Sequence, residues 1–194
     1  MPRNKTFDQF DVVKDAVSLF WQHGFHQTSI QDLVKKLGIN RASLYDTYGD
    51  KEGLFRRCLT TYRNEAIQLA KEIIKADSAK TGMCNLFTWY IESITNDSDK
   101  KGCFVCNTYA ELLPSLAKDE ISDLLNETKK MWINLLLDLL KQAKKNNKIK
   151  PNDNLENTAH AIYASMIGVS ILSKTNTNKT TLKNSLDIHL EIFN

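Results

Sequence analysis

The chain has 194 residues, 42% of them hydrophobic and 25% charged, a composition typical of a globular protein with a sizeable core rather than of a disordered one. Seven glycines and three prolines favour long helices over sheet, and no run of about 18 apolar residues suited to spanning a membrane occurs. The net charge is +3, and residues 1–63 hold all of the excess, with ten Lys and Arg against seven Asp and Glu. This excess in one third of the chain fits a polyanionic partner near the N-terminus.

The chain begins with Met1-Pro2-Arg3-Asn4-Lys5 and has no apolar signal-peptide core, so we expect a cytoplasmic protein without a membrane partner. Four cysteines are too few and too irregularly spaced for a disulfide framework. In a reducing compartment we expect four free thiols that pack as small apolar groups: Cys58, Cys84, Cys103 and Cys106.

Two amphipathic helices are predicted at the start of the chain. The first begins at Thr6, which has capping-box spacing to Gln9, and ends at Gly24, because glycine accepts the left-handed conformation found at many helix ends. The second begins at Thr28 and ends at Gly38. Its apolar stripe consists of Ile30, Leu33, Val34 and Leu37. A helix this short is marginal in isolation and must pack against its neighbours.

A third short helix is predicted over residues 41–48, with Asn40 as its N-cap. Two short helices joined by a three-residue turn are typical of a helix-turn-helix. The residues expected to pack inward are Ile39, Leu44 and Tyr48, which leaves four residues at the exposed start of the helix: Arg41, Ala42, Ser43 and Tyr45. Arginine can donate two hydrogen bonds to guanine and a small residue permits close approach, so this end suits the major groove of DNA.

A fourth helix is predicted over about residues 51–75, with Asp50 as its N-cap. Its apolar side consists of Leu54, Phe55, Cys58, Leu59, Tyr62, Ala66, Leu69 and Ile73. Lys51 lies in the first turn, where a cation opposes the helix dipole. A DNA phosphate would compensate that charge, but a solvated lysine fits the sequence equally well.

The segment from Gly24 to Leu54 resembles the DNA-binding domain of the TetR family. The matching elements occur in order and at the family's spacing. They are Gly24, the pair Thr28-Ser29, the turn Leu37-Gly38-Ile39, the pair Leu44-Tyr45, the aromatic residue Tyr48 and the sequence Lys51-Glu52-Gly53-Leu54.

The resemblance implies an all-α fold with a three-helix helix-turn-helix head and a C-terminal helical bundle for ligand binding and dimerisation. It implies a homodimer that binds double-stranded DNA at a palindromic operator, most often as a repressor that a small-molecule effector releases. By position, Arg41 and Ala42 are expected to read bases. Phosphate contacts are expected from Thr28, Ser43, Tyr45, Thr47 and Lys51. Thr47 stands where the family often has histidine or tyrosine, and its shorter side chain reaches less far toward a phosphate.

The remaining two thirds of the chain predict five more helices. Their approximate ranges are 83–94, 103–113, 115 or 118 to the lysine-rich end at 141–150, 155–173 and 180–193. We therefore expect a DNA-binding domain at residues 1–50 and a ligand-binding and dimerisation domain at residues 76–194, linked by the helix at 51–75. The last two helices resemble the family's dimerisation pair, although intramolecular packing explains the same pattern. Gly168, inside the first of them, indicates close approach of another helix.

The segment from Gly102 to Leu112 resembles a subgroup of these regulators that share Gly-Cys, Asn and Glu-Leu at this helix. Cys103 and Cys106 lie one turn apart, and Cys103 lies near a helix N-terminus, which lowers the pKa of a thiol. A redox or electrophile sensor is the alternative to plain packed thiols, whereas zinc is not supported because no second ligand pair follows. Candidate ligand-binding residues are Trp89, Cys103, Asn107 and Trp132, although aromatic residues at helical spacing also suit a core.

These observations predict a ligand-responsive DNA-binding regulator that needs no cofactor. An enzyme on a helical bundle is the first rival, but no nucleophile with a nearby base, phosphate loop or metal pair is evident. A sensor whose head no longer binds DNA is the second rival. Retention of Arg41 and Lys51 argues against it.

Overall fold

The computed structural model describes residues 9–96, 101–112, 120–146, 148–149 and 154–193. These residues form helices and no strand, apart from one isolated bridge between Ile149 and Phe193. The helices are α1 (Gln9–Gln27), α2 (Ile30–Leu37), α3 (Arg41–Tyr48), α4 (Lys51–Ile73), α5 (Ala79–Thr95), α6 (Phe104–Leu112), α7 (Glu120–Lys145), α8 (Leu155–Leu172) and α9 (Lys179–Asp187), followed by a 3₁₀ turn over Ile188–Ile192. The predicted all-α fold is confirmed.

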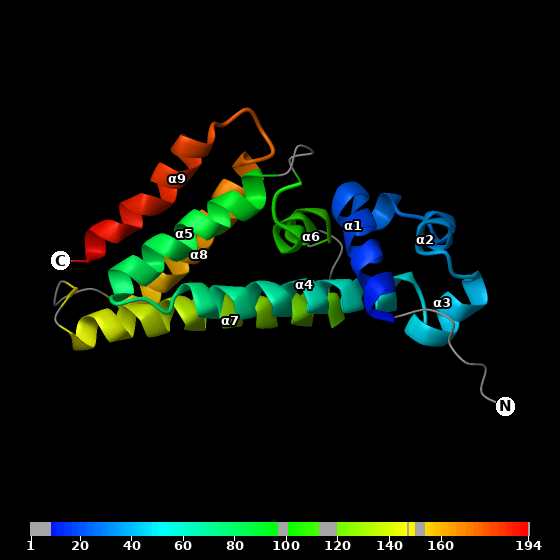
Figure 1. Ribbon diagram of the computed structural model, residues 1–194, viewed down its shortest axis with the longest axis horizontal. Helices are drawn as coiled ribbons and strands as arrows, with labels where there is room; N and C mark the ends of the chain where they lie inside the picture. The colour runs from blue at the N-terminus through cyan, green and yellow to red at the C-terminus, as the bar shows by residue number, and fades with distance from the viewer. Residues whose placement is uncertain (1–8, 97–100, 113–119, 147, 150–153, 194) are drawn as a thin grey trace.

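The molecule has a small head, α1–α3, at one end and a larger bundle, α4–α9, behind it (Figure 1). Helices α4 and α7 run side by side along the long axis, and α5 and α8 pack against them at the end away from the head. Helix α9 packs on α5 and α8. Helix α6 lies between α1 and the bundle. No described helix is long and apolar enough to cross a membrane.

Local hydrogen bonds define the ends of the head helices. Asn40 caps α3 by accepting from the Ser43 amide at 2.8 Å, and Asp50 caps α4 by accepting from the Gly53 amide at 2.7 Å, as predicted. The predicted start of the first helix at Thr6 lies outside the described residues. Its predicted end at Gly24 is a break with a φ of 80°, after which one more helical turn follows.

Ser29, and not Thr28, is the N-cap of α2. The Ser29 hydroxyl accepts from the Asp32 amide at 3.1 Å, and the Asp32 carboxylate accepts from the Ser29 amide at 3.0 Å, which completes a capping box. The prediction that Thr28 starts this helix is therefore wrong by one residue. Both residues are hydroxyl-bearing, so composition alone did not distinguish them.

The head and the start of the bundle share one apolar core. Phe20, Leu33 and Leu44 of the head are buried together with Phe55 of α4 and Phe104 of α6. A second core lies between α5, α7, α8 and α9. On α4 the predicted apolar side drifts: Leu69 is 48% exposed, whereas Ile67 and Ala70 are buried. Leu69 was wrongly predicted as core because 3.6 residues per turn rotate a fixed seven-residue spacing off one face.

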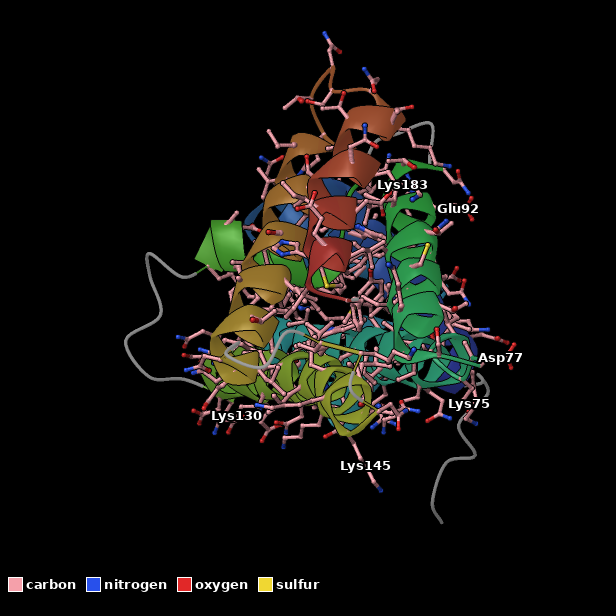
Figure 2. The ribbon with its side chains drawn as sticks, turned by 90° about the vertical axis from the view of Figure 1, so that its left-hand side faces the viewer. Lys75, Asp77, Glu92, Lys130, Lys145 and Lys183 are labelled. Atoms are coloured by element: carbon pink, nitrogen blue, oxygen red, sulfur yellow. The ribbon has the colours of Figure 1, made fainter. Side chains whose placement is uncertain are left out.

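The predicted bundle helices are present with small differences at their ends. The predicted end of α6 at residue 113 and the predicted start of α7 at residue 115 or 118 lie outside the described residues. The last predicted helix, 180–193, is an α-helix only to Asp187 and continues as a 3₁₀ turn. Seen from the end opposite the head, α8 and α9 lie next to α5, with Lys183 and Glu92 near the seam between α9 and α5 (Figure 2).

Candidate functional site

The start of α3 presents a compact polar and basic surface. Arg41, Ala42 and Tyr45 are exposed, and Ser43 and Thr47 are half-buried. The Arg41 guanidinium lies 5.5 Å from the centre of the Tyr45 ring and donates to its hydroxyl at 3.3 Å. These two contacts hold the arginine beside the Tyr45 ring, which reduces the rotamer freedom that Arg41 would lose on binding a base.

The two other predicted phosphate contacts have partners inside the protein. Thr28 is 1% exposed, and its hydroxyl donates to the Gly24 carbonyl at 2.6 Å. The Lys51 ammonium donates to the carbonyls of Phe25 and Thr28 at 2.9 and 3.1 Å, and it lies 4.2 Å from the centre of the Phe25 ring. Both side chains stabilise the connection between α1 and α2 and do not point outward as the sequence suggested.

A bundle residue that the sequence analysis noted only as the glutamate of the Glu-Leu pair also holds this connection. The Glu111 carboxylate accepts from the backbone amides of Phe25 and His26 at 2.9 and 2.8 Å. Glu111 lies at the end of α6, more than 80 residues further along the chain. No local pattern of spacing could have revealed this contact, because it depends on how α6 packs against α1.

Between α4, α5, α6, α7 and α8 the bundle contains a cavity of about 260 Å³. Its aromatic wall consists of Trp21, Tyr62, Trp89, Tyr90, Trp132 and Tyr163. Trp89 and Trp132 stack with ring centres 6.4 Å apart. The Trp21 indole N–H is buried and has no hydrogen-bond partner within the described part of the chain. The cavity thus offers a largely apolar surface.

Three of the four predicted ligand-binding residues, Trp89, Cys103 and Trp132, line this cavity, whereas Asn107 does not. The Asn107 amide donates to the Lys101 carbonyl at 2.8 Å and accepts from the Lys174 ammonium at 3.1 Å. It faces a separate groove between α1, α6 and α8. Asn107 lies outside the cavity wall because Lys101 and Lys174 hold its amide beside this groove, contacts that spacing along the sequence does not specify.

Two thiols meet in the cavity wall at the start of α6. A hydrogen bond from the Cys106 thiol, helped by backbone amides and by the Tyr62 hydroxyl 3.7 Å from the sulfur, lowers the pKa of Cys103 to about 7 despite its burial. The same hydrogen bond and burial raise the pKa of Cys106. The Cys103 backbone amide donates to the Ser170 hydroxyl at 3.0 Å, which ties this end of α6 to α8. The site therefore contains one thiol suited to react as thiolate at neutral pH.

Within the described residues, no three His, Cys, Asp or Glu side chains cluster in the manner of metal ligands.

Comparison with known protein families gives a match for the N-terminal head and another for the C-terminal bundle. Residues 12–58 match the family described as bacterial regulatory proteins of the tetR family, and residues 79–188 match the tetracyclin repressor-like C-terminal domain. An uncharacterised HTH-type transcriptional regulator from Bacillus subtilis, YezE, is 27% identical over the whole length of both chains. The transcriptional repressor ComR of Escherichia coli is 29% identical over 89% of this chain and 82% of its own. These relatives are named as transcriptional regulators and not as enzymes.

Solved structures share the fold over nearly the whole chain. A mutant of the TetR family regulator CifR, in complex with double-stranded operator DNA, superposes with a TM-score of 0.81 at 24% identity and covers 97% of this chain and 98% of its own. A TetR family regulator from Agrobacterium tumefaciens superposes with a TM-score of 0.84 at 17% identity, covering 95% and 96%. With a helix-turn-helix head, a helical bundle and both family models matched in order, the chain belongs to the TetR family of transcriptional regulators.

Proposed function

We propose that this regulator binds a palindromic operator as a homodimer and that a small molecule in the bundle cavity lowers its affinity for DNA. The observation that carries the proposal is the start of α3, where Arg41 and Ala42 are exposed at the surface of a helix-turn-helix. These two residues would read bases. Ser43, Tyr45 and Thr47 would contact phosphates. The family acts on DNA, so the proposed site of action is the cytoplasm.

Thr28 and Lys51 contribute indirectly in this proposal. Their hydrogen bonds hold the backbone immediately before Ser29, the N-cap of α2. The first amides of a helix have no partner within the helix, so those of Ile30 and Gln31 are available to a phosphate. The phosphate contact expected from the Thr28 side chain is thus replaced by backbone donors that Thr28 helps to place.

Exposed apolar groups on the last helices support the dimer. Ile171 and Leu172 at the end of α8 are 40% and 47% exposed, and Ile188 after α9 is 60% exposed. Among the described residues, no atom of another helix lies within 4 Å of the position where a Cβ on Gly168 would stand, so the close approach it suggested is not made by this part of the chain. A second copy packed on α8 and α9 would cover these groups and would hold two heads about 34 Å apart, the spacing of successive major grooves.

The cavity defines the proposed effector as a compact, largely apolar molecule. Six aromatic residues lie in its wall, and a ligand of matching size and apolar character would bury its surface against them. The effector can lower DNA affinity only by as much as its own affinity differs between two states of the dimer, one with the heads placed for DNA binding and one with the heads placed differently.

A thiol sensor is a second candidate, favoured by the contact between Cys103 and Cys106 in the cavity wall. In this version an activated alkene enters the cavity and the Cys103 thiolate adds to its β-carbon. The C=C π bond breaks as the sulfur–carbon bond forms, and the α-carbon takes up a proton from water.

Selection of the purified protein against random duplex DNA tests the main proposal. The wild type should enrich a palindrome. Arg41→Ala should relax the preference at one base position per half-site and cost about 1–3 kcal/mol, because it removes a base contact. Lys130→Ala, an exposed lysine of α7 labelled in Figure 2, is the matched charge control and should leave the motif unchanged. If the wild type enriches no motif at low salt, the proposal is wrong.

A further inference from the structure

Glu111 joins the bundle to the head through both of its carboxylate oxygens. Oε2 accepts from the Phe25 amide at 2.9 Å and Oε1 accepts from the His26 amide at 2.8 Å. Both amides follow the break in α1 at Gly24, where the helical hydrogen-bond pattern is interrupted. A carboxylate that receives two backbone donors makes charge-assisted bonds, which are stronger than neutral ones.

Gly24 makes this contact possible in two ways. Its φ of 80° lies in the left-handed region, which side-chain-bearing residues rarely adopt. A Cβ built on Gly24 would also lie 2.7 Å from Glu111 Oε2, so any side chain would displace the carboxylate. The local structure of α1 and the position of α6 therefore depend on each other at this point.

The same short segment, residues 24–28, is held from its other side by α4. Lys51 donates to the Phe25 and Thr28 carbonyls, and the Thr28 hydroxyl donates to Gly24. The next residue is Ser29, which caps α2. A displacement of this segment would move the start of α2, and α3 follows after a turn of three residues.

The opposite end of α6 lies in the wall of the effector cavity. Cys103, Val105 and Cys106 line the cavity, and Glu111 is at the far end of the same helix, which has nine residues. At 1.5 Å per residue such a helix is roughly 13 Å long and moves as one body. Figure 1 shows α6 between the bundle and α1.

We propose that Glu111 is the positioning residue through which the state of the cavity sets the placement of α2 and α3. The inference rests on the proposed function, because it assumes that an occupied cavity changes operator affinity. An adduct on Cys103 displaces the start of α6, and the Glu111 carboxylate transmits the displacement to residues 24–28. Glu111 itself contacts neither the effector nor the DNA.

The test uses N-ethylmaleimide as the occupant of the cavity. All variants carry Cys84→Ser, which removes the half-exposed thiol outside the cavity, and mass spectrometry verifies a single adduct on Cys103. Operator dissociation constants are measured before and after alkylation, and their ratio is the coupling. The reference protein should show a ratio of about ten or more, within the range usual for allosteric coupling.

In Glu111→Ala the ratio should fall to within about twofold of one. In Glu111→Gln, which keeps the shape and one acceptor oxygen and so guards against a failure to fold, the ratio should lie between these values. Glu72→Gln is the matched control, because Glu72 is an exposed carboxylate at the far end of α4 that pairs with Lys75 at 2.6 Å. Its ratio should equal that of the reference protein.

The outcomes separate the inference from the function on which it rests. Unchanged ratios in both Glu111 variants, with folding verified by circular dichroism, would show that Glu111 only stabilises the structure and would overturn the inference. If the reference protein binds its operator but its ratio is one, an adduct in the cavity does not change operator affinity. That outcome would refute both the control of DNA binding by the cavity and its transmission through Glu111. Absence of any operator binding would refute the proposed DNA-binding function itself.

Discussion

Lys51 is a charged side chain that stabilises the head through contacts within the protein. A cation in the first turn of a helix opposes the helix dipole. Here two backbone carbonyls and the face of the Phe25 ring compensate the Lys51 charge. The lysine thereby connects the start of α4 to the end of α1, and it supports the same segment that Glu111 holds from the bundle.

The reactivity of Cys103 tests the thiol candidate at the residue scale. Because the pKa of Cys103 is lowered to about 7, the thiolate fraction should rise from low pH and be half-maximal near pH 7. The rate of alkylation by iodoacetamide should follow that curve, as measured by mass spectrometry of the Cys103 peptide. Cys106→Ala should shift the midpoint upward, because it removes the thiol whose hydrogen bond is the largest cause of the lowered pKa.

Cys103→Ser, which should abolish modification at this position, is the control. A rate that still increases steeply through pH 8–9, as for an ordinary thiol, would contradict the assigned environment and weaken the sensor candidate.

At the scale of elements, the stability of α2 depends on its N-cap. The helix has only eight residues, so the loss of one capping hydrogen bond affects a large part of it. Ser29→Ala removes the hydroxyl that accepts from the Asp32 amide and should lower the free energy of unfolding by about 1 kcal/mol. Urea denaturation followed by circular dichroism measures the change.

Gln31→Ala on the same helix is the matched control, since Gln31 is exposed and alanine has the highest helix propensity. It should leave the free energy of unfolding within about 0.5 kcal/mol of the wild type. Equal effects of the two substitutions would mean that the capping box does not contribute as the structure indicates.

At the scale of the whole molecule, the proposed dimer depends on apolar groups that one chain leaves uncovered. Ile188 is the most exposed of them, and burying a side chain of this size contributes about 1.5–3 kcal/mol. Ile188→Glu places a charge in that interface and should convert the dimer to a monomer, as measured by light scattering after size-exclusion chromatography.

Lys130→Glu changes the charge of an exposed α7 residue and should preserve the dimer. A wild type that is monomeric at micromolar concentration would contradict the proposed dimer, and an Ile188→Glu variant that remains dimeric would place the interface elsewhere. The monomeric variant should also bind the operator more weakly, because two linked heads gain from their high effective concentration.

Much of the fold was accessible from the sequence because it depends on neighbours in the chain. Helical spacing predicted every described helix, and the short-range signals of Asn40 and Asp50 located the starts of α3 and α4. Errors occurred where two adjacent residues had the same chemistry, as with Thr28 and Ser29, or where a spacing drifted, as at Leu69. The exposed start of α3 was also predictable, since it follows from which faces of three short helices are apolar.

By itself, then, the sequence determined the all-α architecture, the helix-turn-helix and the family to which the chain belongs, because these depend on residue types at short, regular spacing. The tertiary structure alone decided that Lys51 and Thr28 point inward, that Asn107 leaves the cavity wall and that Glu111 reaches Phe25 and His26. These contacts join segments far apart in the chain, and their existence depends on the relative placement of whole helices, which no local pattern specifies.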